Sequence, residues 1–302
     1  MTYQLLAILN PESTFADKAK YVLQKNKIRY VLSNKKSGMK QILEDNIRND
    51  RIKFIVCGGD GTINSFINTY MQLSKNKRNL VTAGFLPCGK TNDLTRALDV
   101  PGDLEKALGK ILKNKSQNID LIKVNKSYFI TGGGLGLITD VVKDADRISS
   151  GKKGKFLSRC IKDIVYVLAV IKNILFRYAG LEVTVSSDNK KKQKLKNLML
   201  LSVQNQKFIG KRFFLTPKAN NSDGVFELVF VEKPDNLISD FVTIRQIIKG
   251  QHLKSGKAKE IRAKKVSIYT KKRQQFMADG ELLCFSDKFR FEIIPKAIRV
   301  CY

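Results

Sequence analysis

One glycine-rich turn constrains the fold of this chain more than any other part of its sequence. The apolar run Lys53 to Cys57 stops abruptly at a Gly-Gly-Asp-Gly-Thr motif, Gly58 to Thr62, and an apolar-periodic segment follows. Three glycines let the backbone turn tightly and approach a ligand, while the N–H groups that begin the next helix carry the positive end of its dipole. The pattern predicts a strand, a phosphate-binding turn and a helix. A tight turn without a ligand fits the same residues, so other features must decide.

Asp60 is an unexpected residue in a phosphate-binding turn, because a carboxylate repels an anion. The repulsion is offset when a metal ion or an ordered hydrogen-bond network accompanies the phosphate. The turn therefore favours Mg²⁺–nucleotide chemistry over simple phosphate binding.

The charge of the chain predicts an anionic partner. The 302 residues include 56 Lys and Arg against 27 Asp and Glu, a formal net charge of +29. Such a charge attracts nucleic acid or acidic lipid and does not distinguish between them. Because the lysines are dispersed along the chain, a merely solvated basic surface fits as well.

Cysteine and histidine usage limits the chemistry. The five cysteines are odd in number and widely spaced, which is typical of a reducing cytosol and argues against a zinc site. His252 is the only histidine, so imidazole triads and multi-histidine metal centres are excluded, and carboxylates must do any acid–base work. Residues Met1 to Asn10 fit a first strand and not a signal peptide. The apolar stretch Phe156 to Tyr178 has too little uncharged length to span a bilayer, so we expect a core or membrane-facing amphipathic helix.

Strand and helix signals alternate in the first third of the chain, which predicts parallel strands joined by helical crossovers. We assign residues 1–125 to an α/β nucleotide-binding domain, to which residues 295–302 can return. Its predicted strands are Gln4–Leu9, Ile28–Leu32, Lys53–Cys57, Val81–Leu86 and Ile119–Val124. In such a sheet, ligands bind beyond the carboxyl ends of the strands, where three loops fall: Asn10-Pro11, Gly58–Thr62 and Pro87–Asn92.

Residues 126–294 have a different character, with alternating strand-like runs and a helical pattern at Leu237–Ile248. We assign them to a largely antiparallel, β-rich domain that binds the acceptor substrate. Because no Pro- or Gly-rich linker marks the boundary, we expect the halves to pack closely around a cleft.

The segment Gly84 to Thr91 satisfies the Walker A spacing, G-x4-G-K-[ST], and raises the possibility of a P-loop NTPase. A P-loop points successive backbone N–H groups at phosphate, but Pro87 has none, and Phe85 and Leu86 fit the end of a buried strand. We therefore interpret the match as accidental and read a strand, a turn and a helix capped by Asn92 or Thr91.

Three motifs occur in a defined order: Gly58 to Thr62, the T-N-D-x-x-R segment Thr91 to Arg96, and the D-G-E segment Asp279 to Glu281. Over nearly the whole chain, this order resembles the bacterial diacylglycerol kinase family, which is related more distantly to sphingosine kinases and NAD kinases. The first motif is shared with NAD kinases, whereas the combination is more specific to the lipid kinases. The resemblance implies an NAD kinase/diacylglycerol kinase-like α/β domain followed by a β-sandwich-like domain.

The resemblance also implies roles for individual residues. ATP would be held by Asn10, Ser33, Gly58, Gly59, Asp60, Gly61, Thr62, Asn64, Gly89, Lys90, Thr91 and Asn92. The family pattern P-x-A-x3-D-G is repeated at Pro217 to Gly224, so Asp223 would anchor a structural Mg²⁺ with backbone oxygens of Asn220 and Val225. Water would link this ion to Asp60, Asp93 and Glu281. Glu281 resembles the family's catalytic base, with Asp279 and Asp60 beside it in the catalytic set. Ordinary hairpin turns also fit Asp223-Gly224 and Asp279-Gly280.

Two departures from the family pattern affect these roles. Lys90 stands where relatives usually have Thr, and Thr131 to Ile138 replaces a segment that typically begins with Asn and ends with Asp. The second departure lies near the expected acceptor pocket, so the sequence defines the reaction better than the lipid.

The expected function is that of an ATP- and Mg-dependent lipid kinase that converts diacylglycerol to phosphatidic acid. We expect a cytoplasmic protein peripherally associated with an anionic membrane, and a homodimer is compatible with the sequence. An NAD kinase-like enzyme and a catalytically degenerate homologue stay open; NAD kinases have an Asn-Glu pair where Asn92-Asp93 stands here. A nucleic-acid binder is disfavoured because basic residues do not alternate with aromatic ones.

Overall fold

The computed structural model describes residues 4–33, 38–113, 115–150, 172, 180–188, 191–210, 213–256 and 258–302. The chain divides into two compact units. The first unit contains Met1–Thr131 together with the later segments Asn220–Val225 and Ile293–Tyr302. The second contains Gly132–Ala219 and Phe226–Glu292. Each unit is therefore assembled from segments far apart in the sequence.

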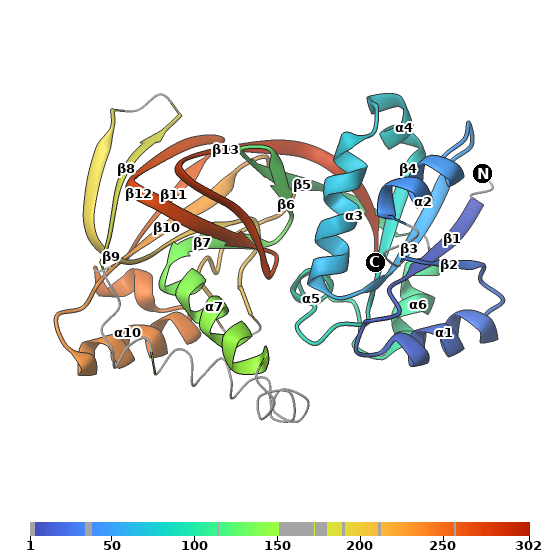
Figure 1. The fold of residues 1–302 in the computed structure, drawn as a ribbon, viewed down its shortest axis with the longest axis horizontal. Helices are drawn as coiled ribbons and strands as arrows, with labels where there is room; N and C mark the ends of the chain where they lie inside the picture. Colours follow the sequence, from blue (N-terminus) through green and yellow to red (C-terminus); the bar gives the residue numbers. More distant parts are fainter. Residues whose placement is uncertain are drawn as a thin grey trace. The chain divides into compact units, whose positions relative to one another are not determined.

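The first unit is built on a parallel sheet, which confirms the α/β fold predicted for this part of the chain (Figure 1). Its strands run in the order β2 (Tyr30–Leu32), β1 (Gln4–Leu9), β3 (Ile52–Gly58), β4 (Val81–Pro87) and the C-terminal end of β13 (Glu281–Cys301). Beyond β13 lies a hairpin of β5 (Ser116–Val124) and β6 (Ser127–Phe129).

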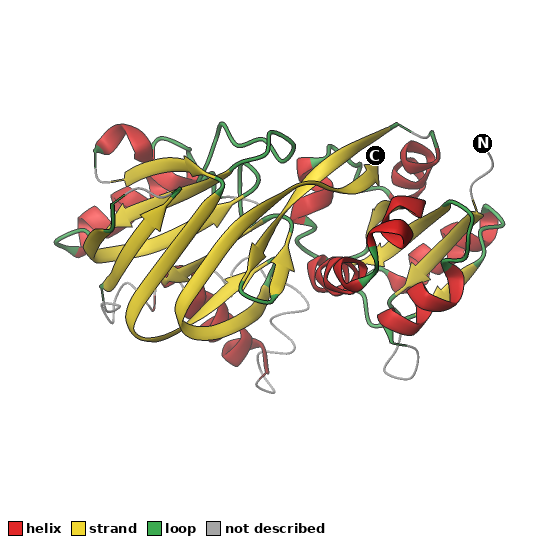
Figure 2. Ribbon diagram, turned by 90° about the horizontal axis from the view of Figure 1, so that it is seen from above, coloured by secondary structure: helices red, strands yellow, loops and turns green. Residues whose placement is uncertain are grey.

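Helices cover both faces of this sheet (Figure 2). They are α1 (Ala16–Lys25), α2 (Met39–Asn46), α3 (Asp60–Gln72), α4 (Lys75–Leu80), α5 (Asp93–Ala97) and α6 (Leu104–Leu112). Strands covered on both faces are expected to be apolar throughout, and every residue of β3 and β4 is buried.

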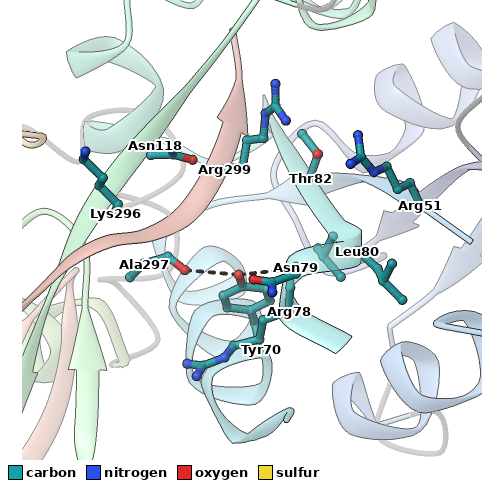
Figure 3. Close-up of a pocket in the computed structure, with 11 residues that line it drawn as sticks. Arg51, Tyr70, Arg78, Asn79, Leu80, Thr82, Asn118, Lys296, Ala297 and Arg299 are labelled. Atoms are coloured by element: carbon teal, nitrogen blue, oxygen red, sulfur yellow. Dashed lines mark hydrogen bonds between the residues drawn. The ribbon is translucent and has the colours of Figure 1, made fainter. Parts of the chain in front are cut away.

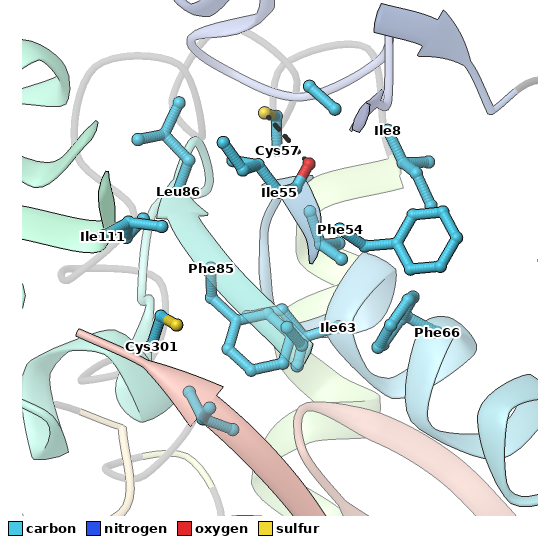
Figure 4. Packing of buried hydrophobic residues seen from close by; sticks show 14 of the residues in the cluster. Ile8, Phe54, Ile55, Cys57, Ile63, Phe66, Phe85, Leu86, Ile111 and Cys301 are labelled. Carbon is cyan, nitrogen blue, oxygen red and sulfur yellow. Dashed lines mark hydrogen bonds between the residues drawn. The ribbon is translucent and has the colours of Figure 1, made fainter. Parts of the chain in front are cut away.

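Side chains from alternate strand positions fill the two layers of this core (Figure 4). On one face, the rings of Phe54 and Phe85 both lie 6.1 Å from the ring of Phe66 in α3, in edge-on contacts. On the other face, Gly84 lets α6 come close, because a Cβ there would lie only 2.4 Å from Cγ2 of Ile111. The positions of α3 and α6 on the sheet thus depend on aromatic packing and on one missing side chain.

Buried Asp120 in β5 joins three parts of the first unit. Its carboxylate accepts hydrogen bonds from the backbone N–H groups of Gly224 (2.7 Å) and Lys296 (2.6 Å), and its own N–H donates to the carbonyl of Asn221 (2.8 Å). Asp120 is fully buried. One residue therefore attaches the two later segments, Asn220–Val225 and Ile293–Tyr302, to the N-terminal part of the first unit.

The second unit is β-rich and antiparallel, as predicted. Its strands are β7 (Gly132–Gly136), β8 (Leu181–Ser187), β9 (Gln193–Gln204), β10 (Phe226–Glu232), β11 (Ala258–Ala263), β12 (Lys265–Ala278) and the N-terminal part of β13. The order is β11-β10-β9-β7-β12-β13, and β8 also pairs with β9 and β12. At β12 and β13, the rings of Phe276, Phe289 and Phe291 form a compact cluster.

Two helices, α7 (Leu137–Ser150) and α10 (Leu237–Ile248), pack on the β9–β10 part of this sheet. Leu137 of α7 and Ile247 of α10 share one apolar cluster with Val229 of β10. The helix predicted at Leu237–Ile248 has the expected bounds, whereas the one expected at Phe156–Tyr178 lies outside the described residues. In the described part of the chain, no helix is long and apolar enough to cross a bilayer.

His252 follows α10 in a short 3-10 turn, His252–Ser255, and is completely buried. Its Nε2 lies 3.1 Å from the carbonyl oxygen of Leu215. Burial lowers the pKa of His252, and the hydrogen bond to Leu215 counteracts this only in part. The imidazole is therefore a neutral core group.

Asp120→Ala should lower the free energy of unfolding by about 2–3 kcal/mol, because two backbone N–H groups lose a charged acceptor. Asp120→Asn, which keeps one acceptor oxygen, should lose less. Urea unfolding measures both, with exposed Asp50→Ala as the control, expected to stay within about 0.5 kcal/mol of the native chain. Equal stability of Asp120→Ala and Asp50→Ala would show that Asp120 does not hold these segments.

His252 should make the protein less stable as the pH falls below about 6.5, the ordinary pKa of histidine. Between this value and the lowered pKa in the fold, the unfolded chain binds a proton that the folded chain excludes, so acid favours unfolding. His252→Gln retains an N–H donor for Leu215 but does not titrate. The stability difference between the native chain and this variant should therefore shrink from pH 7.5 to pH 5; a constant difference would contradict the prediction.

Candidate active site

Three loops meet at the carboxyl ends of the parallel strands in the first unit. Asn10 follows β1, and its side-chain Nδ2 donates to Oγ1 of Thr62 in the first turn of α3, which follows β3, at 2.9 Å. The backbone N–H of Cys88, at the end of β4, donates to the carbonyl of Gly58 at 3.1 Å. Ser33, at the end of β2, donates its backbone N–H to Leu9. These contacts fix the loops after β1, β3 and β4 against one another.

The loops after β3 and β4 touch through two glycines. A Cβ on Gly89 would lie 2.4 Å from the Cα of Gly59, and a Cβ on Gly59 would lie 3.1 Å from the Cα of Gly89. A Cβ on Gly58 would collide with the side chain of Thr62 at 2.3 Å. Gly59 and Gly89 are therefore required by the close approach of two backbones, and Gly58 by the side chain of Thr62.

Asp60 joins the same two loops by hydrogen bonds. Its carboxylate oxygens accept the backbone N–H groups of Asn92 (3.1 Å) and Asp93 (3.0 Å), which begin α5. Asn92 occupies the N-cap position predicted for it, but with φ +53° its side chain does not cap the helix. The Asn92 amide instead closes its own loop, accepting from the N–H of Gly89 and donating to its carbonyl. Asp60 thus stands in an ordered hydrogen-bond network.

The N-terminus of α3 provides a site for an anion beside these loops. The helix begins at Asp60, and the first bond of its ladder is from Ile63 N–H to the carbonyl of Gly59. The N–H groups before Ile63 in the first turn of α3, including that of Gly61, have no helical carbonyl four residues earlier to accept them. They carry the positive end of the helix dipole. A phosphate group suits this position.

The other residues predicted to hold ATP lie around these loops with distinct contacts. Asn64 is buried one turn into α3, and its Nδ2 donates to the carbonyl of Tyr128 in β6 at 3.3 Å, so it joins α3 to the β5–β6 hairpin. Lys90 and Thr91 are half-buried in the loop before α5. Asp93 is buried and lies 3.9 Å from the guanidinium of Arg96.

The segment predicted to hold Mg²⁺ belongs to the first unit and is held there by Asp120. Asp223 is exposed, and its Oδ1 accepts the backbone N–H of Val225 at 3.3 Å. The side-chain Oδ1 of Asn220 accepts from the N–H and the hydroxyl of Ser222. Carboxylate and carbonyl oxygens are the donors that Mg²⁺ prefers, so the residue types fit this ion. Within the described ranges, no three His, Cys, Asp or Glu side chains form a metal-binding group, and the set would rely on backbone oxygens and water.

Asp279 and Glu281 lie in the second unit, at the hairpin between β12 and β13. Asp279 and Gly280 form a two-residue turn with φ of +51° and +78°, and Ala278 pairs directly with Glu281. Asp279 is buried, with its N–H donating to the carbonyl of Gly132 at 3.1 Å, whereas Glu281 is exposed. The hairpin thus presents Glu281 to solvent and buries Asp279.

Two buried polar residues near these segments were missed by the sequence reasoning. Asp120 positions the Asp223 segment, but the pattern of β5 gives no hint of its distant partners. Gln204 pairs with Gly132 in β7 and donates to the hydroxyl of Ser202 at 2.5 Å. Its Oε1 is buried and has no hydrogen-bond partner within the described residues. In the run Leu200 to Gln204, alternation alone does not mark this glutamine as buried.

Cys57 and Cys88 lie buried beneath the two glycine loops. A hydrogen bond with the Cys88 thiol and burial raise the pKa of Cys57 well above its ordinary value. Cys57 therefore remains a neutral thiol that fills space in the core, and it is no candidate for nucleophilic chemistry.

A basic pocket of about 240 Å³ lies in the first unit at the strand ends opposite to the glycine loops (Figure 3). Arg51, Arg78, Lys296 and Arg299 contribute to its lining, next to the starts of β3 and β4. The hydroxyl of buried Tyr70 donates to the carbonyl of Ala297 at 3.1 Å, and burial raises its pKa to about 12 although Arg78 opposes this. The pocket is thus distinct from the predicted ATP loops.

Gly89→Ala should separate the two loops, because its Cβ would lie 2.4 Å from the backbone Cα of Gly59 and 2.8 Å from Oδ1 of Asn92. We expect a loss of about 1–3 kcal/mol of unfolding free energy and an ATP affinity at least tenfold lower. Gly109→Ala in α6, where a Cβ meets nothing within 4 Å, is the matched control and should be neutral or stabilising. Calorimetric titration with ATP measures the effect; native affinity in Gly89→Ala would contradict it.

Both units match protein families. Residues 4–124 match the family described as Diacylglycerol kinase catalytic domain, and residues 150–302 match the YegS C-terminal NAD kinase beta sandwich-like domain. The chain is 28% identical to a diacylglycerol kinase of Bacillus subtilis strain 168 over 229 residues, which cover 75% of this chain and 70% of that protein. It is 29% identical to a diacylglycerol kinase of Staphylococcus carnosus strain TM300, over 78% of this chain and 72% of that protein.

Solved structures share the fold. A crystal structure of a diacylglycerol kinase from Bacillus anthracis strain Sterne has a TM-score of 0.77 at 20% identity, over 99% of this chain and 96% of that one. An NAD kinase from Archaeoglobus fulgidus, in complex with ATP, has a TM-score of 0.55 at 11% identity, over 99% of this chain and 94% of that one. Because the two family matches together cover residues 4–124 and 150–302, and the second alone spans about half of the chain, this chain belongs to the diacylglycerol kinase family of lipid kinases.

Proposed function

We propose that this chain transfers the γ-phosphoryl group of ATP to the hydroxyl group of diacylglycerol, forming phosphatidic acid at a membrane surface. The paired glycine loops carry this proposal, since Asp60 bonds the start of α5 to the start of α3 and Gly59 touches Gly89. Family membership supports phosphoryl transfer from ATP to a lipid. Relatives that are 28% and 29% identical are named diacylglycerol kinases, which supports the choice of acceptor.

The first unit would bind and orient the nucleotide. Phosphoryl transfer needs positioning and neutralisation of negative charge more than it needs covalent help from the protein. The N–H groups at the start of α3 carry the positive end of the helix dipole, which would attract the phosphates of the nucleotide. Asp223 with backbone oxygens of Asn220 and Val225 would hold Mg²⁺, which supplies positive charge to the phosphates. The ammonium of Lys90 adds a further cation in the loop before α5.

Glu281 is the proposed general base. Its carboxylate is exposed at a two-residue hairpin turn, where it can accept the proton of an acceptor hydroxyl as the oxygen attacks phosphorus. Asp279 is buried in the same turn and would fix the position of Glu281. His252, the only histidine, is a neutral buried residue with a backbone partner, so a carboxylate is the available group for this step.

Kinase assays with labelled ATP should offer diacylglycerol, monoacylglycerol, sphingosine, a polyprenol and NAD side by side. We expect the label in phosphatidic acid. Label in NADP instead would favour an NAD kinase, with which the chain shares its fold at a TM-score of 0.55. No product with any acceptor would indicate a degenerate homologue.

Glu281→Gln should lower kcat by about 10²- to 10⁴-fold, the usual contribution of a general base. Glu232→Gln, at another exposed glutamate of the second unit, is the matched control and should retain native activity. Because Glu281 is exposed, both variants should unfold at the same temperature as the native chain. Native turnover in Glu281→Gln would remove this residue from the catalytic role.

A further inference from the structure

Helix α10 presents apolar side chains to solvent. Successive residues of an α-helix are rotated by about 100° around its axis, and on this basis the exposed residues of α10 lie within an arc of about 140°. Five of them are apolar, with exposed fractions from 38% at Leu237 to 77% at Ile238. Together with exposed Phe214 they form the α10 patch, which consists of Phe214, Leu237, Ile238, Phe241, Val242 and Ile248.

The protein-facing side of the same helix is more polar than its solvent-facing side. Asp240, Thr243 and Ile247 are buried, and of these only Ile247 belongs to the apolar core cluster of this unit. A helix on a protein surface normally turns its apolar side inward. Because α10 does the reverse, packing among the described residues of this unit does not account for its exposed apolar residues.

The patch continues onto a second segment. The backbone N–H of Phe214 donates to the carbonyl of Ile247 at 3.1 Å, and its ring packs on that of Phe208 with centroids 5.8 Å apart. Phe214 is 37% exposed despite these contacts. The apolar surface is therefore held in place by two different parts of the second unit, and it is not confined to a single exposed turn.

The charges around the patch are complementary to an anionic surface. Arg245 and Lys249 are exposed on the same arc, and Lys254 is exposed shortly after the helix. Acidic residues near it are Glu232 and Asp235, which precede the helix, and Asp240, which is buried on the inner side. None of these carboxylates lies on the exposed arc of α10.

This combination favours a lipid surface over a second copy of the chain. A two-fold contact between α10 helices would bring the same cations together from both copies, each with a net charge of +29. In a bilayer, apolar side chains enter the acyl region while Arg and Lys extend to anionic headgroups. The anionic bilayer satisfies both features of the patch.

We propose that the α10 patch inserts into the surface of an anionic lipid bilayer, with its apolar residues at the acyl boundary and Arg245 and Lys249 at headgroup level. The inference rests on the proposed function in that the bilayer supplies the acceptor lipid. It assigns membrane docking to one helix of the second unit.

A fluorescent probe at Phe241 tests insertion directly, because the chain has no tryptophan. The emission of Phe241→Trp should shift to shorter wavelength with vesicles of phosphatidylcholine and phosphatidylglycerol, and much less with phosphatidylcholine alone. Rising salt should reverse part of the shift. Tyr21→Trp, at a 63% exposed position of α1, is the matched control and should not shift. No shift at Phe241, or equal shifts at both positions, would overturn the proposal, as would a shift without vesicles that grows with protein concentration.

Vesicle sedimentation of substituted chains supplies a second measurement. Ile238→Ser with Phe241→Ser should bind phosphatidylglycerol vesicles at least tenfold more weakly, and so should Arg245→Gln with Lys249→Gln. The controls are Tyr21→Ser with Leu32→Ser and Lys20→Gln with Lys106→Gln, which remove exposed groups of the same kind elsewhere. Native binding in both α10 variants would overturn the proposal. A midpoint of thermal unfolding equal to that of the native chain shows that a variant is folded.

Activity with two substrates separates this inference from the proposed function. The α10 variants should keep the native rate on a short-chain diacylglycerol dispersed as monomers and lose at least tenfold on long-chain diacylglycerol in vesicles. Equal losses on both substrates would contradict a docking role. If the native chain phosphorylates neither, the proposed function fails, and the probe and sedimentation results still decide whether α10 binds the bilayer.

Discussion

The carboxylate of Asp60 holds together the loops at the carboxyl ends of the parallel strands in the first unit. By accepting two N–H groups from the start of α5, it fixes that helix against the start of α3, and the side chain of Asn92 is then available to close its own loop on Gly89. The resulting contact between Gly59 and Gly89 leaves no space for a side chain. A residue that looks unsuitable beside a phosphate is thus part of the framework that joins the two glycine loops.

The sequence predicted those features of the fold that arise from local patterns. Strands β3 and β4 are buried on both faces, so apart from Lys53 and Thr82 they are apolar runs that end at glycine or proline. Their predicted bounds are close to the observed ones. The bounds of α10 were predicted because its apolar residues have helical spacing. Periodicity did not reveal that the apolar side faces solvent, since Ile247 on the inner side is apolar as well.

Contacts between distant segments could not be read from local patterns. Asp120 binds backbone groups 104 and 176 residues away, and a backbone N–H leaves no trace in the side-chain sequence. Strand β7 was not expected as a strand because it is rich in glycine, which weakens isolated strands. Its glycines are explained by close neighbours, since a Cβ on Gly133 would lie 2.3 Å from the carbonyl oxygen of Met277. Residue type predicted that Asn92 or Thr91 caps α5, whereas the carboxylate of Asp60 accepts the N–H groups at the start of that helix.

The return of β13 to the first unit has a consequence for synthesis on the ribosome. One edge of β4 pairs with Val300 and Cys301 of β13. The backbone N–H of Lys296, in the same strand, donates to Asp120. Lys296 is synthesised 176 residues after Asp120, so until it emerges a nascent chain carries an open strand edge at β4 and a buried carboxylate that lacks one of its donors. A chain that stalls before this point lacks part of the first unit, so folding of that unit depends on a segment synthesised long after its other parallel strands.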